Sequence, residues 1–415
     1  MDYFELREQL GITHLPDLLA PYYQPRPAAP LIDRGALSEL LKLGELNGEA
    51  ETRILRALDE IERDERLCSF TGFVIEQTCL QRERLDPEHI ALTDCAALSE
   101  ASRAFYPLLV LLACVPLSLR RVRARGVPEQ AALPIVEKMT KELLHRYGKT
   151  GNPAVSFAWS ANFMTCSIFL FDRFYLIPHP FSADFTIFQN EKTGEVCALM
   201  KEGVRVRRDG QYDGVSGVFD TETFATVRAD TEQAFFGHRV SPIGAVCSRP
   251  VQLPRSEWRQ AVLPGQAFLA LHIPGGPGYT PERLRSSLQQ GLAFYDTYFP
   301  ELSVRGIWSE SWLYDPHLRL VLDGQSGIIQ MQNQMYCAPF AHGHASIHGE
   351  LHSKQGGKTS LEQAVEAYEA AGGTFASCYM FILREDVERI GGPSLYGGLT
   401  DADEFIEANR PQAKR

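Results

Sequence analysis

The sequence has few of the features that mark secreted, membrane-spanning or repeat proteins. Its nine cysteines form no CxxC pair and are odd in number, which indicates reduced thiols rather than a disulfide framework. No internal repeat or low-complexity segment is visible. The first eleven residues, MDYFELREQLG, contain no apolar core of the kind found in signal peptides. We therefore expect a cytoplasmic protein.

The sequence also has few long apolar runs and fewer basic than acidic residues. The most apolar run, Ala104–Leu119, contains Pro107 and Pro116 and is shorter than a membrane span, so it predicts a buried core helix. Acidic residues outnumber basic ones, 52 to 41, which leaves a net charge of −11. This excess argues against nucleic acids or anionic membranes as general partners. The globular composition over 415 residues predicts two domains, or three.

Residues 1–150 show helical periodicity. Apolar residues recur at helical spacing over Tyr3–Leu10, Leu37–Leu43, Glu49–Leu67 and Pro128–Tyr147, and Gly148 suits a helix end. Between the last two segments, four arginines occur within the six residues 120–125. Such a run can bind an anion, but it is typical of a solvated helix C-terminus, which is how we interpret it.

From residue 151 to 395 the apolar pattern changes to a period of two. Strands are predicted at Ile168–Ile177, Asp184–Gln189, Val196–Lys201, Phe224–Ala229, Val246–Leu253, Ile328–Tyr336 and Thr374–Leu383. Asp209-Gly210 predicts a hairpin between Val204–Arg207 and Val215–Phe219. A helix is predicted at Ser360–Ala371, and residues 396–415 read as a polar tail. The fold class is therefore α+β, with a helical domain before a mixed α/β domain.

The stretch Ala267–Pro316 combines a strand, a glycine loop, a helix and a second strand. Ala267–Ile273 is apolar and suits a buried strand, and the loop PGGPG must turn the chain. Thr280-Pro281-Glu282 favours a helix start, because it offers a cap, a proline at the first helical position and an acidic first turn. The second strand is Val304–Trp308.

This order is one by which α/β folds bind phosphate. Glycines let the backbone approach an anion, and the free N–H groups of a helix N-terminus point at it. The loop GGPGY, however, is not GxGxxG and lacks the Lys-Ser/Thr of a P-loop. From the residues alone, an anion site and a plain tight turn both remain open.

Four segments in order resemble a family of bacterial acyltransferase-like proteins with an N-acyltransferase N-terminal helical domain and a GNAT-like C-terminal domain. They are RARGVP with the long helix after it (123–148), IFLFDRF (168–174), HIP with SL and FP (272–300), and SESWLYDP followed by SGIIQMQ (309–332). The second departs from the family's FRLGRLQF-like strand. The resemblance covers residues 90–390, and it implies residues 1–150 as the N-terminal domain and 151–395 as a GNAT-like domain with a largely antiparallel sheet.

The resemblance also implies a reaction and a co-substrate. GNAT-like proteins move an acyl group from a CoA thioester to an amine, so the expected co-substrate is acetyl-CoA or another acyl-CoA and the expected partner is a small-molecule amine. The CoA pyrophosphate would then lie on Gly275, Gly276, Gly278 and Tyr279 at the start of the helix. Pro277 removes one backbone donor from this loop. The alternative to a CoA site is therefore a loop in which CoA binding is altered or lost.

Amine acylation needs a base for the ammonium group and an acid for the leaving thiolate. Glu310 and His272 follow the two predicted strands at the end where α/β sites gather, so either is a candidate base. Each also has a structural interpretation, as a surface carboxylate and a hydrogen-bonded core histidine. Tyr336 and Ser311 are candidate acids. Trp312 is interpreted as packing, and Asp315 as a cap for the next short helix.

A histidine-rich segment is unrelated to this resemblance. His342, His344, His348 and His352 lie within eleven residues, and the last three share one face if the segment is helical. Zinc could bind two of them with Glu350, but the segment contains two glycines and no HExxH, so we expect a polar loop without zinc. Three functions remain open: a GNAT-like N-acyltransferase, a catalytically silent binding module of the same fold, and a metal-dependent hydrolase.

Overall fold

The structure is a computed structural model that describes residues 2–12, 15–81, 90–341, 347 and 359–409. The chain forms two compact units. The first comprises Met1–Leu170, Tyr175–His179 and Thr297–Pro300, and the second comprises Phe171–Phe174, Pro180–Asp296 and Glu301–Arg415. We expected the first domain to end at 150. Its compact unit continues to Leu170, because α7 (Phe157–Met164) packs against α5 and α6.

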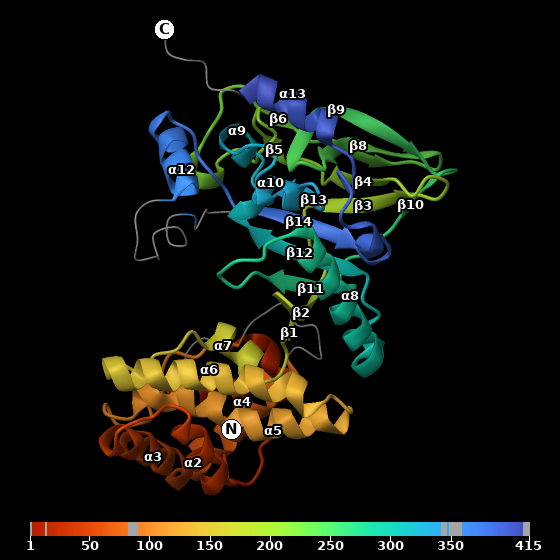
Figure 1. Ribbon diagram of the computed structural model, residues 1–415. Coiled ribbons are helices and arrows are strands. Elements are labelled where there is room, and N and C mark those ends of the chain that lie inside the picture. The colour runs from red at the N-terminus through yellow and green to blue at the C-terminus, as the bar shows by residue number, and fades with distance from the viewer. Residues whose placement is uncertain (1, 13–14, 82–89, 342–346, 348–358, 410–415) are drawn as a thin grey trace. The chain divides into compact units, whose positions relative to one another are not determined.

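The first unit is helical (Figure 1). Its helices are α1 (Tyr3–Leu10), η1 (Asp17–Tyr22), α2 (Arg34–Lys42), α3 (Gly48–Arg63), α4 (Glu65–Leu80), η2 (Arg103–Phe105), α5 (Tyr106–Ala124), α6 (Glu129–Thr150) and α7. Four of them begin where a side chain caps the first turn, at Asp2, Asp33, Asn47 and Asp64. Each cap accepts a hydrogen bond from a backbone N–H group that has no partner inside the helix. The predicted helices of residues 1–150 are confirmed, with two differences. The segment Glu49–Leu67 is divided at Asp64 between α3 and α4, and α6 continues past Gly148 to Thr150, with Gly151 as its C-cap.

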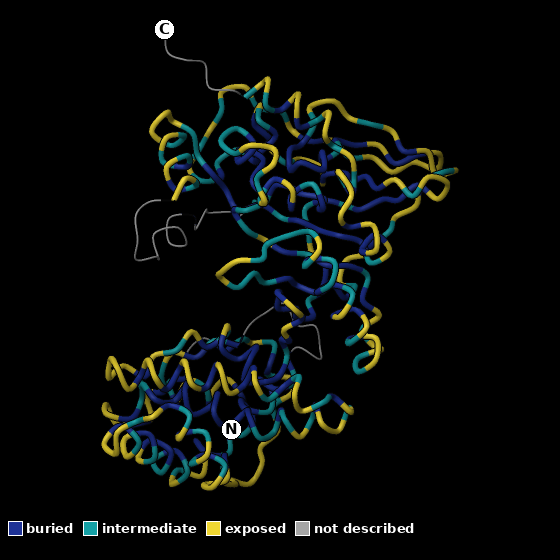
Figure 2. Tube along the Cα trace, viewed as in Figure 1, coloured by how far each residue is buried: buried dark blue, intermediate teal, exposed yellow. Residues whose placement is uncertain are grey.

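Helix α5 is the core of this unit. Its residues from Tyr106 to Val115 are all buried. Figure 2 colours the trace by burial, and dark buried segments run through the helical unit. The span Arg103–Ala124 is long and apolar enough to cross a membrane, but 72% of its most apolar window is buried inside the protein, as in a core helix. The arginine run forms the last turn of α5 and the residue after it, so its interpretation as a helix end is confirmed.

The second unit contains two larger sheets and one small one. In the first, β11 (Ala267–His272), β12 (Gly306–Ser311), β14 (Cys378–Leu383) and β13 (Tyr336–Pro339) are consecutive neighbours. The second has the order β10 (Trp258–Gln260), β3 (Phe185–Asn190), β4 (Val196–Met200), β8 (Ala234–Ser241), β7 (Arg228–Asp230), and β9 (Ala245–Pro254) also pairs with β8. All described pairs are antiparallel except β11–β12.

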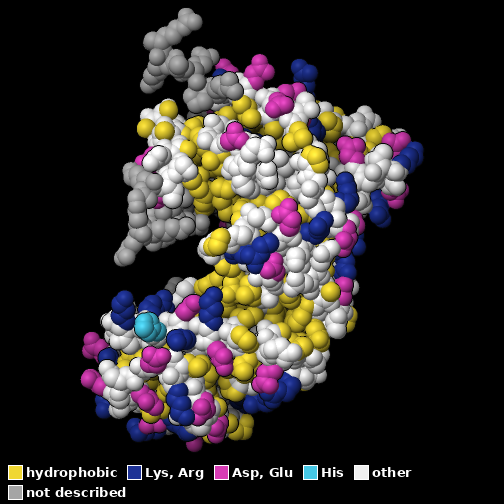
Figure 3. Space-filling view, viewed as in Figure 1, with side chains coloured by type: hydrophobic (Ala, Val, Ile, Leu, Met, Phe, Trp, Pro, Cys, Tyr) yellow, Lys and Arg dark blue, Asp and Glu magenta, His cyan; other side chains and the backbone are white. Residues whose placement is uncertain are grey.

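The other elements after α7 are two strands that precede β3, the two strands of the small sheet, and several helices. They are β1 (Phe169–Phe171), β2 (Phe174–Pro180), the pair β5 (Arg205–Val206) and β6 (Phe224–Ala225), η3 (Val215–Gly217), α8 (Pro281–Tyr298), η4 (Pro300–Leu302), η5 (Trp312–Tyr314), α9 (Leu318–Val321), α10 (Gly327–Gln332), α12 (Ser360–Ala370), η6 (Arg384–Arg389) and α13 (Leu399–Asn409). The α+β fold class is confirmed. Acidic and basic side chains are interspersed on the face shown in Figure 3, so no single sign of charge dominates it.

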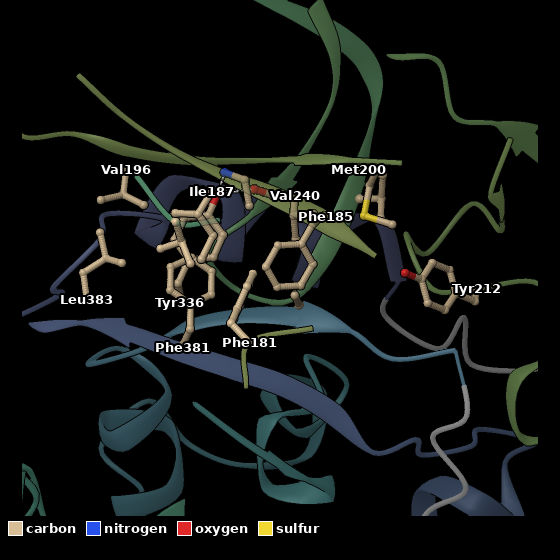
Figure 4. Close-up of a cluster of buried hydrophobic side chains, with 14 of the residues drawn as sticks. Phe181, Phe185, Ile187, Val196, Met200, Tyr212, Val240, Tyr336, Phe381 and Leu383 are labelled. Atoms are coloured by element: carbon tan, nitrogen blue, oxygen red, sulfur yellow. Dashed lines mark hydrogen bonds between the residues drawn. The ribbon is translucent and has the colours of Figure 1, made fainter. Parts of the chain in front are cut away.

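The core of the second unit lies between its two larger sheets. Phe185, Ile187 and Val240 from the second sheet pack with Tyr336 and Phe381 from the first, as Figure 4 shows. The Tyr336 and Phe381 rings stack with centroids 4.7 Å apart. Sheets that alternate apolar and polar residues bury one face in this way, which explains the period of two in the sequence.

Three predictions for this unit were wrong in detail. Val215–Phe219 is not a strand, because Ser216 has a φ of 56° and the segment forms a 3-10 turn. The expected strand Ile328–Tyr336 is mostly helix α10, with β13 beginning only at its last residue. The segment 396–415 is more than a polar tail, because helix α13 buries Ala402 and Phe405.

Candidate active site

The two parallel strands β11 and β12 separate toward their carboxyl ends. They pair at Phe268–Gly306, Leu269–Ile307 and Ala270–Trp308, although both strands continue beyond these residues. Past the last pair, the carbonyl of Leu271 accepts a hydrogen bond from the Ser309 hydroxyl at 2.8 Å. A side chain has thus replaced the backbone ladder on this edge of β12, while its other edge stays paired with β14 as far as Ser311. Strands that part in this way leave backbone edges open to a ligand.

His272 and Glu310 lie at this opening. Each lies two residues past the last pair of the ladder, Ala270–Trp308. Because strand residues alternate, Glu310 lies on the same face of the sheet as Trp308. His272 is half-buried and Glu310 is exposed. Glu310 is also the cross-strand neighbour of Tyr379 on β14. Burial and the Glu310 carboxylate raise the pKa of the Tyr379 hydroxyl to about 12. Both candidate bases therefore lie at the carboxyl ends of β11 and β12.

The loop after β11 presents bare backbone. Gly276 and Gly278 have φ angles of 110° and 91°, which side chains rarely adopt. A Cβ added at Gly275 or Gly276 would meet no atom within 4 Å, so the space beside these two residues is open. Gly278 is different, because a Cβ there would lie 2.5 Å from Nη1 of Arg283. The open side of the loop is therefore at Gly275 and Gly276.

Arg173 holds this loop from beneath. Its guanidinium group donates hydrogen bonds to the carbonyls of Gly276 at 3.0 Å and Pro277 at 2.9 Å, and also to that of Pro274. The side chain is buried, and no carboxylate lies within 4.0 Å of its guanidinium group among the described residues. Neighbouring Asp172 instead binds Arg283 through two hydrogen bonds. Arg173 therefore places positive charge directly under the glycine loop.

Sequence reasoning did not assign Arg173 to the site. Its three carbonyl partners are 101 to 104 residues away in the chain, so no local pattern connects them. One signal was present: Asp172 and Arg173 interrupt the apolar segment IFLFDRF. Asp172 has a φ of 47°, which marks the tight turn between β1 and β2. A charged pair inside an apolar strand pattern indicates such a turn and a nearby partner.

The start of helix α8 is partly occupied by the protein's own groups. The Thr280 hydroxyl accepts a hydrogen bond from the backbone N–H of Arg283 at 3.4 Å. Hydrogen bonds from its own backbone N–H and from Thr280 lower the pKa of the Glu282 carboxyl. An incoming anion would compete with this carboxylate for the helix N-terminus. The residues fit an anion better at the loop, above Arg173, than at the helix end.

Two domain profiles match the sequence. The N-acyltransferase N-terminal domain matches residues 35–166, and the GNAT-like C-terminal domain matches residues 224–381. The two matches follow each other along the chain, the first over the helical unit and the second over the β-rich unit. The second match contains β11, the glycine loop, α8 and β12, so the strand opening described above lies inside the GNAT-like domain.

Solved structures share the fold of the whole chain. A crystal structure of an acyltransferase in complex with decanoyl-CoA superposes with a TM-score of 0.53 at 17% identity, over 92% of this chain and 99% of the other. A second, in complex with decanoyl-CoA and teicoplanin, has a TM-score of 0.51 at 18% identity with the same coverage. No curated protein sequence matches the chain. At this identity the likeness shows the fold alone.

Tyr279 and Tyr336 are placed away from the opening of the GNAT-like domain. Burial, with Tyr314 beside it, raises the pKa of the Tyr279 hydroxyl well above its ordinary value. Its ring packs against Phe174 with centroids 6.1 Å apart. The Tyr336 hydroxyl donates to the carbonyl of Val240 at 2.5 Å and accepts from the backbone N–H of Ala198 at 3.1 Å. Tyr336 thus joins the two sheets, and its role as an acid stays a prediction with no geometric support.

The histidine-rich segment lies outside the described residues, apart from Ile347. His342, His344, His348 and His352 are among the residues not described. In the part of the chain that the structure does describe, no group of three or more histidine, cysteine, aspartate and glutamate side chains is arranged to hold a metal ion. The expectation of a loop without zinc stays a prediction.

Proposed function

We propose that the protein is an acyltransferase that moves an acyl group from a CoA thioester to an amine. The observation that carries this proposal is the opening between β11 and β12 beside a glycine loop with a buried cation beneath it. The domain match supports the same reaction class. The thioester would lie along the open strand edges, and the CoA pyrophosphate would lie on the bare backbone of Gly275 and Gly276.

In this mechanism the protein's residues position the reactants and move protons. Glu310 or His272 accepts the proton of the ammonium group, so that the amine nitrogen can attack the thioester carbonyl carbon. The carbon–sulfur bond breaks and the electron pair leaves with sulfur. The protonated base returns its proton to the thiolate, and the nitrogen of the new amide loses its second proton to the freed base or to water, so one proton is released overall. Glu310 is the better candidate because it is exposed at the opening, whereas His272 is half-buried.

The ligands of the similar structures guide the choice of acyl donors and acceptors for the test. Acetyl-CoA was the expectation from sequence, but the two similar acyltransferases hold decanoyl-CoA, and one also holds teicoplanin. The donor panel is therefore acetyl-CoA and decanoyl-CoA. The acceptor panel includes small amines and a glycopeptide, because a larger acceptor must contact more of the protein surface around the opening than a small amine does.

The test measures donor binding and CoA release separately. We expect at least one acyl-CoA to raise the thermal midpoint, and an acceptor to release free thiol from it. Glu310→Gln should lower kcat about 100-fold with little change in the donor KM, because the carboxylate acts on the proton. Glu257→Gln, in the turn between β9 and β10, is the matched control and should leave kcat unchanged. Absence of binding by every acyl-CoA would refute the proposal.

A second candidate is a silent module that binds acyl-CoA without transfer. It is favoured by Glu282, whose carboxylate already occupies the start of α8, and by Pro277, which removes a backbone donor from the loop. Thermal protection by acyl-CoA without thiol release, across the whole acceptor panel, is the result expected of this second function.

A further inference from the structure

The GNAT-like unit contains a cavity of about 700 Å³ that the proposed reaction does not use. Its wall is formed by residues near α9, α10 and α13, by the loop 391–393, and by the first two residues of α8. The glycine loop 275–278 is not part of this wall. The volume lies in the range that holds small-molecule ligands of nucleotide size.

Arg319 on α9 is the buried charge of this cavity. Its side chain is 8% exposed, and its Nη2 donates to Oδ1 of Asn333 at 3.0 Å. Its Nε has no hydrogen-bond partner among the described residues, and no carboxylate there lies within 4.0 Å of the guanidinium group. Burial lowers the pKa of Arg319 from its ordinary value, which nevertheless leaves a guanidinium charged. A buried charge without a counterion is costly, so this arrangement calls for an anion.

The rest of the wall suits the approach of an oxyanion. Gly391 and Gly392 present backbone without side chains, and Gln334 fixes them, because its amide accepts from the N–H of Gly391 at 2.8 Å and donates to the carbonyl of Gly392 at 2.7 Å. Asn333 offers amide N–H donors besides the oxygen that Arg319 uses. Gln330 lies at the exposed rim.

Two carboxylates, those of Glu282 and Asp403, also line the cavity. Both residues are exposed, so water screens their charges. Arg319 is buried, where a charge interacts more strongly with a ligand than it does at the surface. The buried part of the cavity therefore favours a negative group, and the exposed part stays tolerant of polar or neutral groups.

We propose that this cavity binds the phosphate group of a nucleotide-sized ligand, with Arg319 as its charged anchor. The guanidinium fork matches phosphate geometry, and a phosphate in the cavity would balance the charge that no carboxylate of the described residues pairs with. The proposal requires no acyl transfer. Two ligands carry such a phosphate group: a free nucleotide, and CoA through its nucleotide end. If the ligand is CoA, it would contact both the first residues of α8 and the glycine loop.

The test uses calorimetric titration of ADP, CoA and pantetheine into the full chain. Pantetheine carries no phosphate and separates the nucleotide end of CoA from the rest. We expect Arg319→Gln to weaken the binding of ADP and CoA at least about tenfold and to leave pantetheine unchanged. Dependence of CoA binding alone on Arg319, without ADP binding, would identify CoA as the source.

Because Arg319 is buried, a second pair of variants keeps the test independent of folding. Gln330→Lys should strengthen phosphate binding, and Gln330→Glu should weaken it, since the rim residue is exposed and changes only the local charge. Gln290→Lys and Gln290→Glu make the same changes on the exposed side of α8, outside the cavity, and are the controls. Equal affinities in wild type and in both Gln330 variants would overturn the proposal, as would no binding of ADP or CoA to wild type. If the Gln330 variants bind ADP and CoA as tightly as wild type and acyl-CoA still releases free thiol, this proposal fails while the proposed acyl transfer stands.

Discussion

At the scale of single residues, Arg173 is the side chain on which the candidate site depends most. It donates hydrogen bonds to three loop carbonyls, and it brings positive charge under the glycines. We predict that Arg173→Gln lowers the free energy of unfolding by about 1–3 kcal/mol. Acyl-CoA affinity should fall at least about tenfold, because both loop geometry and charge are lost.

Urea unfolding and calorimetric titration of decanoyl-CoA measure these two effects. Arg259→Gln is the matched control, because this arginine is an exposed surface residue 3.6 Å from Glu191 and should change neither quantity. A folded Arg173→Gln variant with wild-type affinity would show that the loop does not bind the anion.

His317 is the residue for which the structure predicts a pH dependence. Its ring contacts Asp315 at 2.7 Å through Nδ1 and Asp209 at 3.3 Å through Nε2. Burial opposes the charged form, but the two carboxylates outweigh it and raise the pKa of His317 to about 9. Arg207 donates to both carboxylate oxygens of Asp209, so the buried cluster holds two positive and two negative charges.

The raised pKa of His317 means that the folded protein holds this proton more tightly than the unfolded chain does. The stabilisation is complete below pH 6.5 and is lost as pH rises through about 9. It amounts to roughly 3 kcal/mol, from about 1.4 kcal/mol for each pKa unit. Urea unfolding from pH 6 to 10 should show this loss in wild type and not in His317→Gln. Parallel curves for the two proteins would contradict the assignment.

The candidate residues differ in how far sequence could place them. His272 and Glu310 could be placed at the carboxyl ends of two strands, because each follows an apolar run that forms a strand. Their role as bases stays a prediction. Tyr336 was also recognised in a strand region, yet its partners Val240 and Ala198 come from the other sheet, 96 and 138 residues away. A hydrogen bond over such a separation leaves no periodic signal in the sequence.

At the scale of elements, strand β12 determines the shape of the opening. Gly306 begins it, where β12 pairs with β11 on one side and β14 on the other. A Cβ at this position would lie 2.6 Å from the carbonyl oxygen of Ile382 and 2.7 Å from the ring of Phe268. Only glycine therefore lets the three strands approach, although its φ is not positive.

We predict that Gly306→Ala lowers the free energy of unfolding by about 1–3 kcal/mol, because the backbone of β14 must shift. Gly324→Ala is the matched control, since a Cβ there would meet nothing within 4 Å. Thermal and urea unfolding of both variants check this. Equal free energies of unfolding for wild type and Gly306→Ala would mean that β12 and β14 can move apart at low cost. The width of the opening would then not be fixed by Gly306.

The elements themselves were predictable where one local pattern dominated. The helices of the first unit have apolar stripes and side-chain caps, so their positions follow from 3.6-residue periodicity. The errors at 215–219 and 328–336 have a different cause. Short apolar runs suit a strand or a helix equally, and here a left-handed Ser216 and the packing of Ile329 and Met331 decided the outcome. Strand β8 was missed because Gly237 and His238 interrupt its alternation.

At the scale of the whole molecule, the first compact unit needs residues beyond the predicted boundary at 150. Helix α7 buries Phe157, Phe163 and Met164, and the ring of Phe163 contacts Tyr175 with centroids 5.5 Å apart. Lys138 on α6 also donates a hydrogen bond to the Tyr175 hydroxyl at 3.0 Å. These contacts indicate that a fragment ending at residue 150 leaves apolar surfaces of α5 and α6 uncovered.

We therefore predict that a fragment of residues 1–180 unfolds cooperatively and at a higher temperature than a fragment of residues 1–150. Burying the side chains of α7 adds several kcal/mol, at about 1.5–3 kcal/mol for each large apolar side chain. Circular dichroism melts of both fragments measure the difference. The variant Phe163→Ala in the longer fragment is the control, and its midpoint should fall toward that of the shorter one. Equal midpoints for residues 1–150 and 1–180 would place the end of the folding unit at 150, because α7 would then add nothing to its stability.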